Sequence, residues 1–432
     1  MVGPGDRRPH RPPSGGGEAV VTTPAQGEPQ TAARLPRAFQ ALWASMAVSS
    51  VGDGALTAAM PLLAAYLTRD PIGVAVVSVG ASLPWFVVGV FAGAWVDRLP
   101  RRSVMIVSDV ARGAALAVLV TLILAGSASI PLLAVVAFVL TTGQVFFDAA
   151  AQAALPQVLG RDTSVLGRAN GRLFATQTVG ATLAGPPIGG ALFGVAPWAP
   201  FAVDAASFVA SSGFVLGVPR ADAPEGGNRL SIRASVREGF AYLFASRILV
   251  TLACALTAYN VCFNLASATL VLFAQEQLGV TDGTFGLLLA SMSAGAIAIG
   301  MVSARVLARI GVGGAVVASL AAQGIGWAGV ALSGSVWLAG VSLAATGAAS
   351  TMVTVAVVSE RQSTVPDALL GRVTSAFRLI GNGFAPLGGV AGGLLAGAAG
   401  LRAPLIAAPV LLALCVVVFG LLLTRRAPIN ED

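Results

Sequence analysis

Runs of about 20 apolar residues follow one another along most of the chain, and short polar or Gly/Pro-bearing breaks separate them. Each run is long enough to cross ~30 Å of hydrocarbon as an α-helix. The pattern therefore predicts an all-α membrane protein. Twelve transmembrane helices are expected, at 39–67, 72–96, 103–125, 131–154, 169–193, 200–218, 247–273, 283–304, 313–332, 336–359, 373–397 and 403–424.

Two polar tails flank the apolar part of the chain. Residues 1–37 are rich in Pro, Gly and Arg and lack apolar periodicity, which is typical of a disordered cytoplasmic tail. No signal peptide is indicated, because the first apolar run starts late and is too long for one. A short cytoplasmic tail is expected at 425–432.

The longest internal break, 219–246, divides the apolar chain. Ile232, Val236, Phe240 and Leu243 recur in it at helical spacing, which predicts a cytoplasmic linker with a helix lying along the membrane surface. Two six-helix halves are expected on either side of this linker, at 38–218 and 247–424.

The two halves resemble each other. The segment "LGRANGRLFATQTVGATLAGPPIGGALFG" at 166–194 is similar to "LGRVTSAFRLIGNGFAPLGGVAGGLLAG" at 370–397, an offset of 204 residues. Many secondary transporters are built from such repeats, with the binding site between them.

Charge sets the expected orientation. Only 10% of the residues are charged, whereas soluble proteins carry about 25%. Outside the first tail and apart from Arg112, eighteen of twenty arginines lie at alternate breaks. The positive-inside rule then places both termini in the cytoplasm. The expected location of the protein is the plasma membrane. Because topology explains the net charge of +7, no nucleic-acid partner is expected.

The residue inventory excludes several classes of chemistry. The chain has no lysine, which a P-loop or a Schiff base requires. Its only histidine is His10, and Cys254, Cys262 and Cys415 lie in apolar segments without a CxxC pair. We expect neither an enzyme, nor a metal site, nor a cofactor.

Ionisable residues inside apolar spans are the sharpest functional signals, because insertion of one costs about 2.5–3.5 kcal/mol at a helix centre. Asp53, between two glycines near the middle of the first span, is the first proton-coupling candidate. Asp109 is the second; with Arg112 at i, i+3 it shares a helix face and can pair. Asp148 and Asp204 lie near span ends.

The stretch "GAWVDRLPRR" resembles the loop signature of the major facilitator superfamily, G-x-L-A-D-R-x-G-R-[KR]. The matching residues are Gly93, Asp97, Arg98, Arg101 and Arg102, while Trp95 and Pro100 depart from it. With the twelve expected spans and the half-repeat, this resemblance covers the whole chain and implies the major facilitator fold. The cluster is expected to latch the inner helix ends in one conformation, with Asp148 as a partner. The alternative is that the arginines serve topology alone.

The second half keeps part of this pattern. "GMVSARVLAR" at 300–309 aligns at an offset of 207 and retains Arg305 and Arg309, but Ala304 stands opposite Asp97. At the same offset Asn260 stands opposite Asp53, so the polar position recurs without a titratable group.

The segment "AGPPIGG" resembles the helix-5 motif G-x8-G-P-x-x-G-G of antiporters in this superfamily. Gly185, Pro186, Gly189 and Gly190 match, and Thr176 replaces the first glycine. The resemblance implies antiport. Generic close packing of helices is the alternative, and the degraded copy "APLGGVAGG" favours it.

Within the superfamily, "FFDAAAQAALPQVL", "PFAVDAASFV" and "RQSTVPDALLGRVTSAFR" look like the macrolide-efflux-type branch of drug exporters, which also includes siderophore exporters. The resemblance implies export of a bulky, partly apolar small molecule in exchange for protons. We expect a monomer. An uptake symporter and a non-transporting sensor or scaffold remain alternatives. Candidate cavity residues are Trp85, Phe86, Arg112, Gln144, Tyr259, Asn260 and Asn264.

Overall fold

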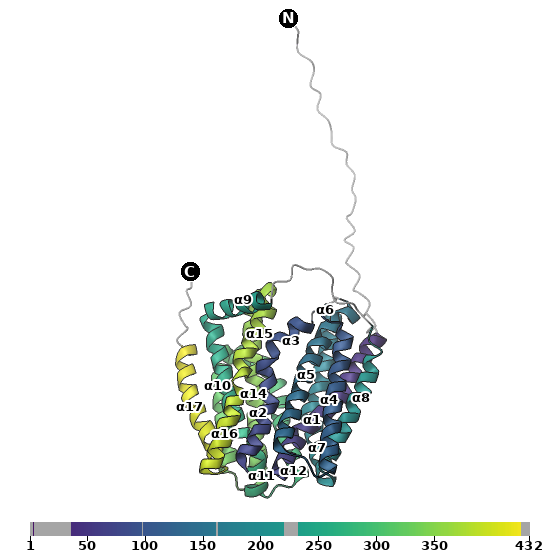
Figure 1. Cartoon of the computed structure of the whole chain (residues 1–432). Helices are drawn as coiled ribbons and strands as arrows, with labels where there is room; N and C mark the ends of the chain where they lie inside the picture. The colour runs from purple at the N-terminus through teal and green to yellow at the C-terminus, as the bar shows by residue number, and fades with distance from the viewer. Residues whose placement is uncertain (1–2, 4–35, 97, 161–162, 220–231, 425–432) are drawn as a thin grey trace, which may run out of the picture. The chain divides into compact units, whose positions relative to one another are not determined.

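A computed structural model describes residue 3 and residues 36–96, 98–160, 163–219 and 232–424. Helices account for nearly all of these residues, and none of them forms a strand. They pack side by side as a bundle, with α1 beginning and α17 ending at its upper end in Figure 1. The predicted all-α membrane fold is confirmed.

The first half, from its N-terminus, contains α1 (Arg37–Leu67), α2 (Pro71–Val87), α3 (Gly89–Val96), α4 (Arg101–Leu124), α5 (Ile130–Leu159), α6 (Thr163–Gln177), the π-helix η1 (Thr178–Ala184), α7 (Gly185–Val195) and α8 (Ala199–Val215). α1 packs on α8, α7 and η1, and α4 packs on α5 and α8.

The second half contains α9 (Ile232–Ala245), α10 (Arg247–Ser267), α11 (Leu270–Leu278), α12 (Asp282–Gly300), α13 (Ser303–Leu332), α14 (Val336–Thr364), α15 (Asp367–Gly383), α16 (Ala385–Ala399) and α17 (Ala403–Thr424). Its helices repeat the packing of the first half: α10 lies on α16 and α17 as α1 lies on α7 and α8.

Several expected spans are interrupted. The span predicted at 72–96 is divided between α2 and α3, and α2, which contains Pro84, ends at Val87. A proline inside a helix removes one backbone hydrogen bond and bends the helix. The span predicted at 169–193 changes to a π-helix before α7. In α13 the chain turns at Gly311, whose φ of +67° suits glycine.

Ten helical segments in the described residues are long and apolar enough to cross a membrane. The two other expected spans, at 72–96 and 200–218, correspond to the shorter apolar helices Pro71–Val87 and Ala199–Val215. The count of twelve spans therefore stays a prediction, although every expected range holds helix.

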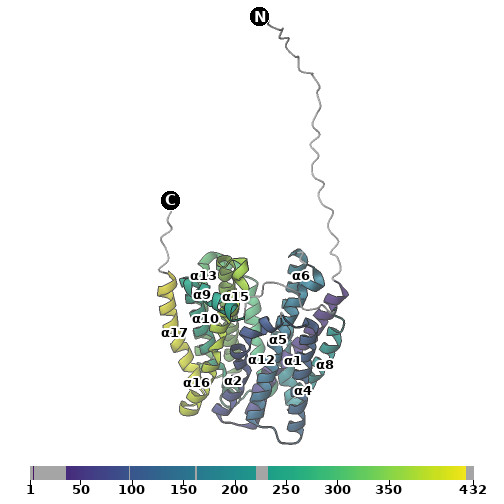
Figure 2. The same cartoon turned by 45° about the horizontal axis from the view of Figure 1, so that its top comes forward.

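The helix α9 lies within the range 219–246 that the sequence predicts as a linker. α9 lies across the upper end of the bundle (Figure 1) and packs on α15, beside which Figure 2 shows it. Glu238 of α9 pairs with Arg372 of α15, the Tyr242 hydroxyl donates to the Thr364 carbonyl oxygen at 3.1 Å, and Leu243 is buried. The predicted tails lie outside the described residues.

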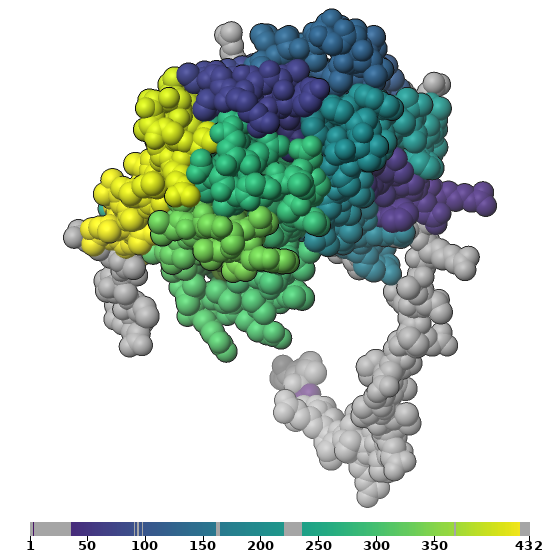
Figure 3. Space-filling view, turned by 90° about the horizontal axis from the view of Figure 1, so that it is seen from below, coloured from purple at the N-terminus to yellow at the C-terminus, as the bar shows by residue number. Residues whose placement is uncertain are grey.

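The lower end of the bundle joins the two halves closely. The Arg69 guanidinium donates to the Gln275 side-chain oxygen at 2.7 Å, and the Gln275 amide donates to Asp282 at 3.0 Å. Figure 3 shows this face, where the green surface of the second half lies against the blue and teal surface of the first. Contacts of α7 with α12 and of α2 with α16 complete the seam.

Candidate functional site

Three adjoining cavities lie inside the bundle and meet at Ala181 of η1. We call them together the central cavity. The first, of about 250 Å³, is lined by the first half alone, whereas the second (about 440 Å³) and third (about 460 Å³) are lined by both halves. Their combined walls run from a charged end to an aromatic one.

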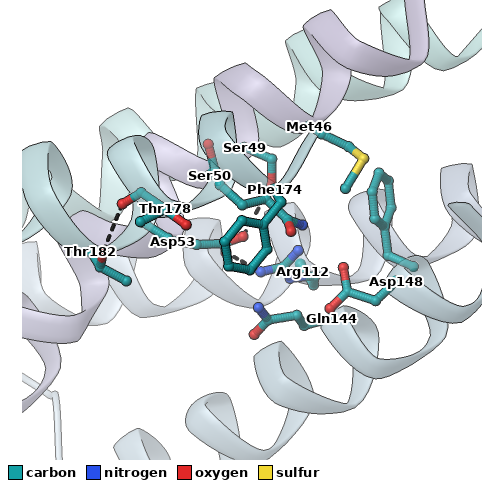
Figure 4. A pocket seen from close by; sticks show the side chains of 13 residues that line it. Met46, Ser49, Ser50, Asp53, Arg112, Gln144, Asp148, Phe174, Thr178 and Thr182 are labelled. Atoms are coloured by element: carbon teal, nitrogen blue, oxygen red, sulfur yellow. Dashed lines mark hydrogen bonds and ion pairs between the residues drawn. The ribbon is translucent and has the colours of Figure 1, made fainter. Parts of the chain in front are cut away.

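An ion pair between Asp53 of α1 and Arg112 of α4 forms the charged end. The Ser49 hydroxyl donates to the second oxygen of Asp53 at 3.3 Å, as Figure 4 shows. Arg112 is 3% exposed and its guanidinium lies 4.0 Å from the centre of the Phe208 ring, a cation–π contact. Both residues line the cavity, and Asp53, at 18% exposed, is the more accessible member of the pair.

Glycines create the space for this pair. A Cβ at Gly52 would collide with the Asp204 carboxylate of α8, and one at Gly54 would lie 2.6 Å from the Ala181 carbonyl oxygen of η1. α1 can thus approach both neighbours while Asp53, between the two glycines, points into the cavity. On α5, a Cβ at Gly143 would lie 2.6 Å from the Arg112 side chain, which passes over this glycine.

Asp109 and Arg112 share a helix face and can pair, but among the described residues no ion pair joins them. Asp109 is fully buried and accepts a hydrogen bond from the Ser211 hydroxyl at 2.6 Å, and Ser211 shares one of 2.8 Å with Ser45. Asp109 thus ties α4 to α8 and α1, while Arg112, one turn later, extends to Asp53. The spacing of three residues on α4 permits a pair of Asp109 with Arg112, but Arg112 pairs with Asp53 of α1 instead.

Buried polar atoms without a hydrogen-bond partner surround this pair. They include one oxygen each of Asp109 and Asp204 and the Nε of Arg112. The other oxygen of Asp204 accepts from Ser207 at 2.8 Å. A buried polar atom without a partner is costly.

Within the described part of the chain, no ion pair joins the residues that are expected to form the latch. Asp97 lies outside that part, Gly93 is in α3, and Arg98 follows that helix. Arg101 opens α4 and donates to the Ala153 carbonyl oxygen at 2.7 Å, and Arg102 is next to it. Trp95, where the signature has leucine, stacks on Phe146 of α5 with ring centres 6.0 Å apart.

Asp148 lines the central cavity together with Asp53 and Arg112 (Figure 4). Among the described residues no ion pair joins it to Arg98, Arg101 or Arg102. This location adds a second carboxylate to the charged end of the cavity, which sequence position near a span end did not indicate.

The other candidate cavity residues divide into two groups. Trp85, Gln144 and Asn264 line the central cavity. Phe86, Tyr259 and Asn260 do not appear in its walls.

Two of the residues outside the wall, Tyr259 and Asn260, serve packing in the second half. Tyr259 is buried and its hydroxyl donates to the Thr346 carbonyl oxygen at 3.3 Å. Asn260 donates to the Gly381 carbonyl oxygen at 2.9 Å and to Asn382 at 3.0 Å, so it ties α10 to α15.

Sequence reasoning missed the aromatic end of the cavity. Phe263, Phe285 and Trp327 line it, with Leu289 and Met292 between them. Trp327 is fully buried, and its ring lies edge-on to that of Phe263. Large apolar residues inside apolar spans give no pattern that separates cavity wall from core.

The glycine motif lies at two helix contacts. A Cβ at Gly185 or Gly189 would collide with the backbone of α1 at Gly54 or Ala55, and one at Gly190 would lie 2.5 Å from the Asp282 carbonyl oxygen of α12. Pro186 lies in the first turn of α7, directly after η1. The motif therefore holds α7 against the central helix of its own half and against the opposite half.

The model of the family of transmembrane secretion effectors matches residues 32–430. No curated protein matches the sequence.

Solved transporter structures share the fold. A POT family transporter in complex with 5-aminolevulinic acid superposes with a TM-score of 0.72 at 10% identity, covering 90% of this chain and 96% of that one. A mutant of the nucleoside transporter NupG gives 0.69 at 13% identity, with 89% and 99% covered. A bacterial homologue of the iron transporter ferroportin, in an inward-facing state, gives 0.69 at 15% identity, with 90% and 99% covered.

Proposed function

The chain belongs to the family of transmembrane secretion effectors and is a membrane transporter with the major facilitator fold, and from that premise we propose that it exports a bulky, partly apolar small molecule in exchange for protons. We also propose that the chain belongs to the macrolide-efflux-type branch, which the sequence motifs resemble. Substrate would occupy the central cavity, and the two six-helix halves would expose it alternately to the two sides of the membrane.

The asymmetric central cavity is the observation that carries the proposal. Its charged end holds Asp53, Arg112 and Asp148, and its other end is lined by Phe263, Phe285 and Trp327. Pockets of several hundred Å³ with mostly apolar walls and a few polar groups suit small-molecule ligands. A compound with a large apolar body and one polar group fits both ends.

Asp53 is the coupling group in this mechanism. Protonation of its carboxylate removes the charge that holds Arg112, so a buried guanidinium would lose its partner. Loss of one partner of a buried ion pair costs about 3–5 kcal/mol, which is enough to change the population ratio of two facing states by about a hundredfold or more. Substrate binding in the same cavity would favour the state in which the pair is intact.

Asp109 is the nearest alternative partner on the same helix. It lies one turn before Arg112 and keeps one buried oxygen without a hydrogen bond, as Arg112 keeps a buried Nε. A guanidinium released from Asp53 could satisfy both groups at once. If the Arg112 guanidinium moved from Asp53 on α1 to Asp109 on α4, its charge would shift within the protein without becoming exposed to lipid.

The deciding experiment measures export in proteoliposomes under an imposed pH gradient, after a panel of antibiotics and siderophores has identified a substrate by efflux from cells with and without an uncoupler. Asp53→Asn should bind substrate but not export it uphill. Because this variant leaves Arg112 unpaired, the matched control is the neutral double variant Asp53→Asn/Arg112→Gln, which should fold normally and still fail to pump.

Three outcomes would contradict the proposal. Uphill export by the double variant at the wild-type rate would place coupling elsewhere, with Asp109 the next candidate. Accumulation of substrate in cells instead of exclusion would indicate an uptake symporter of the same fold. Transport of no compound at any pH would favour a sensor or scaffold.

A further inference from the structure

A second cavity, separate from the central one, lies beneath α9. We call it the α9 pocket. It has a volume of about 370 Å³ and is lined by Phe240 and Phe244 of α9, Val250 and Cys254 of α10, residues of α15, Phe384, and Phe86 of α2. None of its lining residues lines the central cavity.

The walls of the α9 pocket are built for an apolar occupant. Among the described residues that line it none is charged, and four are phenylalanines. Phe240 and Phe244 stack with ring centres 5.9 Å apart, and both Phe244 and Phe384 remain exposed. A Cβ at Gly383 would lie 2.7 Å from the Phe86 ring, so this glycine lets a side chain of the first half reach a pocket of the second.

Two exposed arginines lie close in the sequence to residues that line the α9 pocket. Arg247 lies one turn before Val250 on α10 and three residues after Phe244, and Arg237 lies one turn before Phe240 on α9; both arginines are exposed. Glu238, the acid of α9, is already paired with Arg372. An anionic group above an apolar chain therefore complements this site. That combination is the chemistry of a phospholipid.

We propose that the α9 pocket binds an anionic phospholipid, with an acyl chain between the phenylalanines and the phosphate at Arg247 and Arg237. α9 lies across the end of the bundle (Figure 1), the position of an interfacial helix, where headgroups and chain ends meet. Because α2, α9, α10 and α15 all contribute, a bound lipid would contact both halves. This inference does not depend on the transported substrate.

Cys254 supplies the reporter, because it lines the pocket and is exposed. The Cys262→Ala/Cys415→Ala variant of the full chain keeps it as the single thiol. Its alkylation by N-ethylmaleimide is measured in nanodiscs of phosphatidylcholine, with and without phosphatidylglycerol. Phosphatidylglycerol should slow alkylation by about fivefold or more, since each arginine near an anionic headgroup contributes ~1 kcal/mol.

Two variants separate a site from general surface attraction. Arg237→Gln/Arg247→Gln should remove the difference between the two lipids. The matched pair Arg305→Gln/Arg309→Gln removes the same charge from exposed arginines of α13 and should leave the difference intact. Val250→Trp, which fills the pocket, should reduce the phosphatidylglycerol that stays bound in native mass spectrometry, whereas Arg305→Gln should not.

Equal alkylation rates in both lipids would overturn the proposal. So would loss of the difference in the α13 pair, which would show bulk electrostatics. Slower alkylation caused by the transported compound, with no effect of the lipid, would identify the pocket as part of the substrate path instead.

Discussion

The two halves of the protein share an arrangement of helices, but different side-chain interactions join the helices in each half. In the first half, the central helix α1 is tied to α4 by the ion pair of Asp53 with Arg112. In the second half, α10 is tied to α15 by neutral hydrogen bonds from Asn260, which stands opposite Asp53 in the repeat. Buried charged side chains among the described residues, Asp109, Arg112 and Asp204, all belong to the first half. The first half thus contains the buried charged side chains, and the second half supplies the apolar wall of the central cavity.

The difference separates what the fold needs from what the function needs. Both halves pack their central helix against a glycine-rich partner, since a Cβ at Gly189 would collide with α1 and one at Gly388 with α10. Packing is therefore symmetric, and charge is not. Buried charge is expensive to keep in a membrane, so its restriction to one half supports the proposal that coupling uses one set of ionisable groups.

The largest expected effect comes from breaking the ion pair between Asp53 and Arg112. Asp53→Asn should lower the free energy of unfolding by about 3–5 kcal/mol, because it leaves the Arg112 guanidinium buried without an anion. Asn260→Ala should cost only about 1–2 kcal/mol, the loss of neutral hydrogen bonds. Thermal unfolding in detergent measures both, and equal losses would contradict the asymmetry.

The next contrast is between the charged residues in the corresponding loops of the two halves. Asp97→Asn should reduce transport about tenfold or more at normal membrane abundance, since the sequence predicts that Asp97, which lies outside the described residues, latches the inner helix ends. Arg305→Ala, in the acid-free loop of the repeat, should change transport by less than about twofold. Transport assays at matched expression decide it; equal loss in both would mean that the loops serve topology alone.

The glycine contacts should respond alike in the two halves. Gly189→Ala and Gly388→Ala each force a Cβ against a backbone and should destabilise by about 1–3 kcal/mol. Melting temperatures measured in detergent should fall by similar amounts. A loss confined to Gly189, with Gly388→Ala unaffected, would favour a role in antiport beyond packing.

The smallest expected effect is in the N-terminal tail. Deletion of residues 1–30 should leave export unchanged, because the segment has no apolar pattern with which to bind the bundle. Transport by the truncated protein at equal membrane abundance tests this. A large loss would reveal a partner of the tail that its composition does not indicate.

The sequence alone determined the helical class, the two-half plan and the identity of the unusual side chains. Apolar runs of membrane-spanning length and an internal repeat are visible without coordinates, since they depend on residues close in the chain or on a constant offset. An acid between two glycines in an apolar span was also visible. The span boundaries were less so, because prolines and glycines inside apolar runs divide helices without changing hydropathy.

Only the tertiary structure decided which groups meet. Spacing on one helix suggested Asp109 as the partner of Arg112, but the ion pair joins α1 to α4, because Gly143 leaves the arginine room to extend to Asp53. The same holds for Asn260, which packs instead of lining the cavity, and for Trp327, which lines it. Residues that are apolar and distant in sequence acquire their roles from which helix faces converge, and no local pattern encodes that convergence.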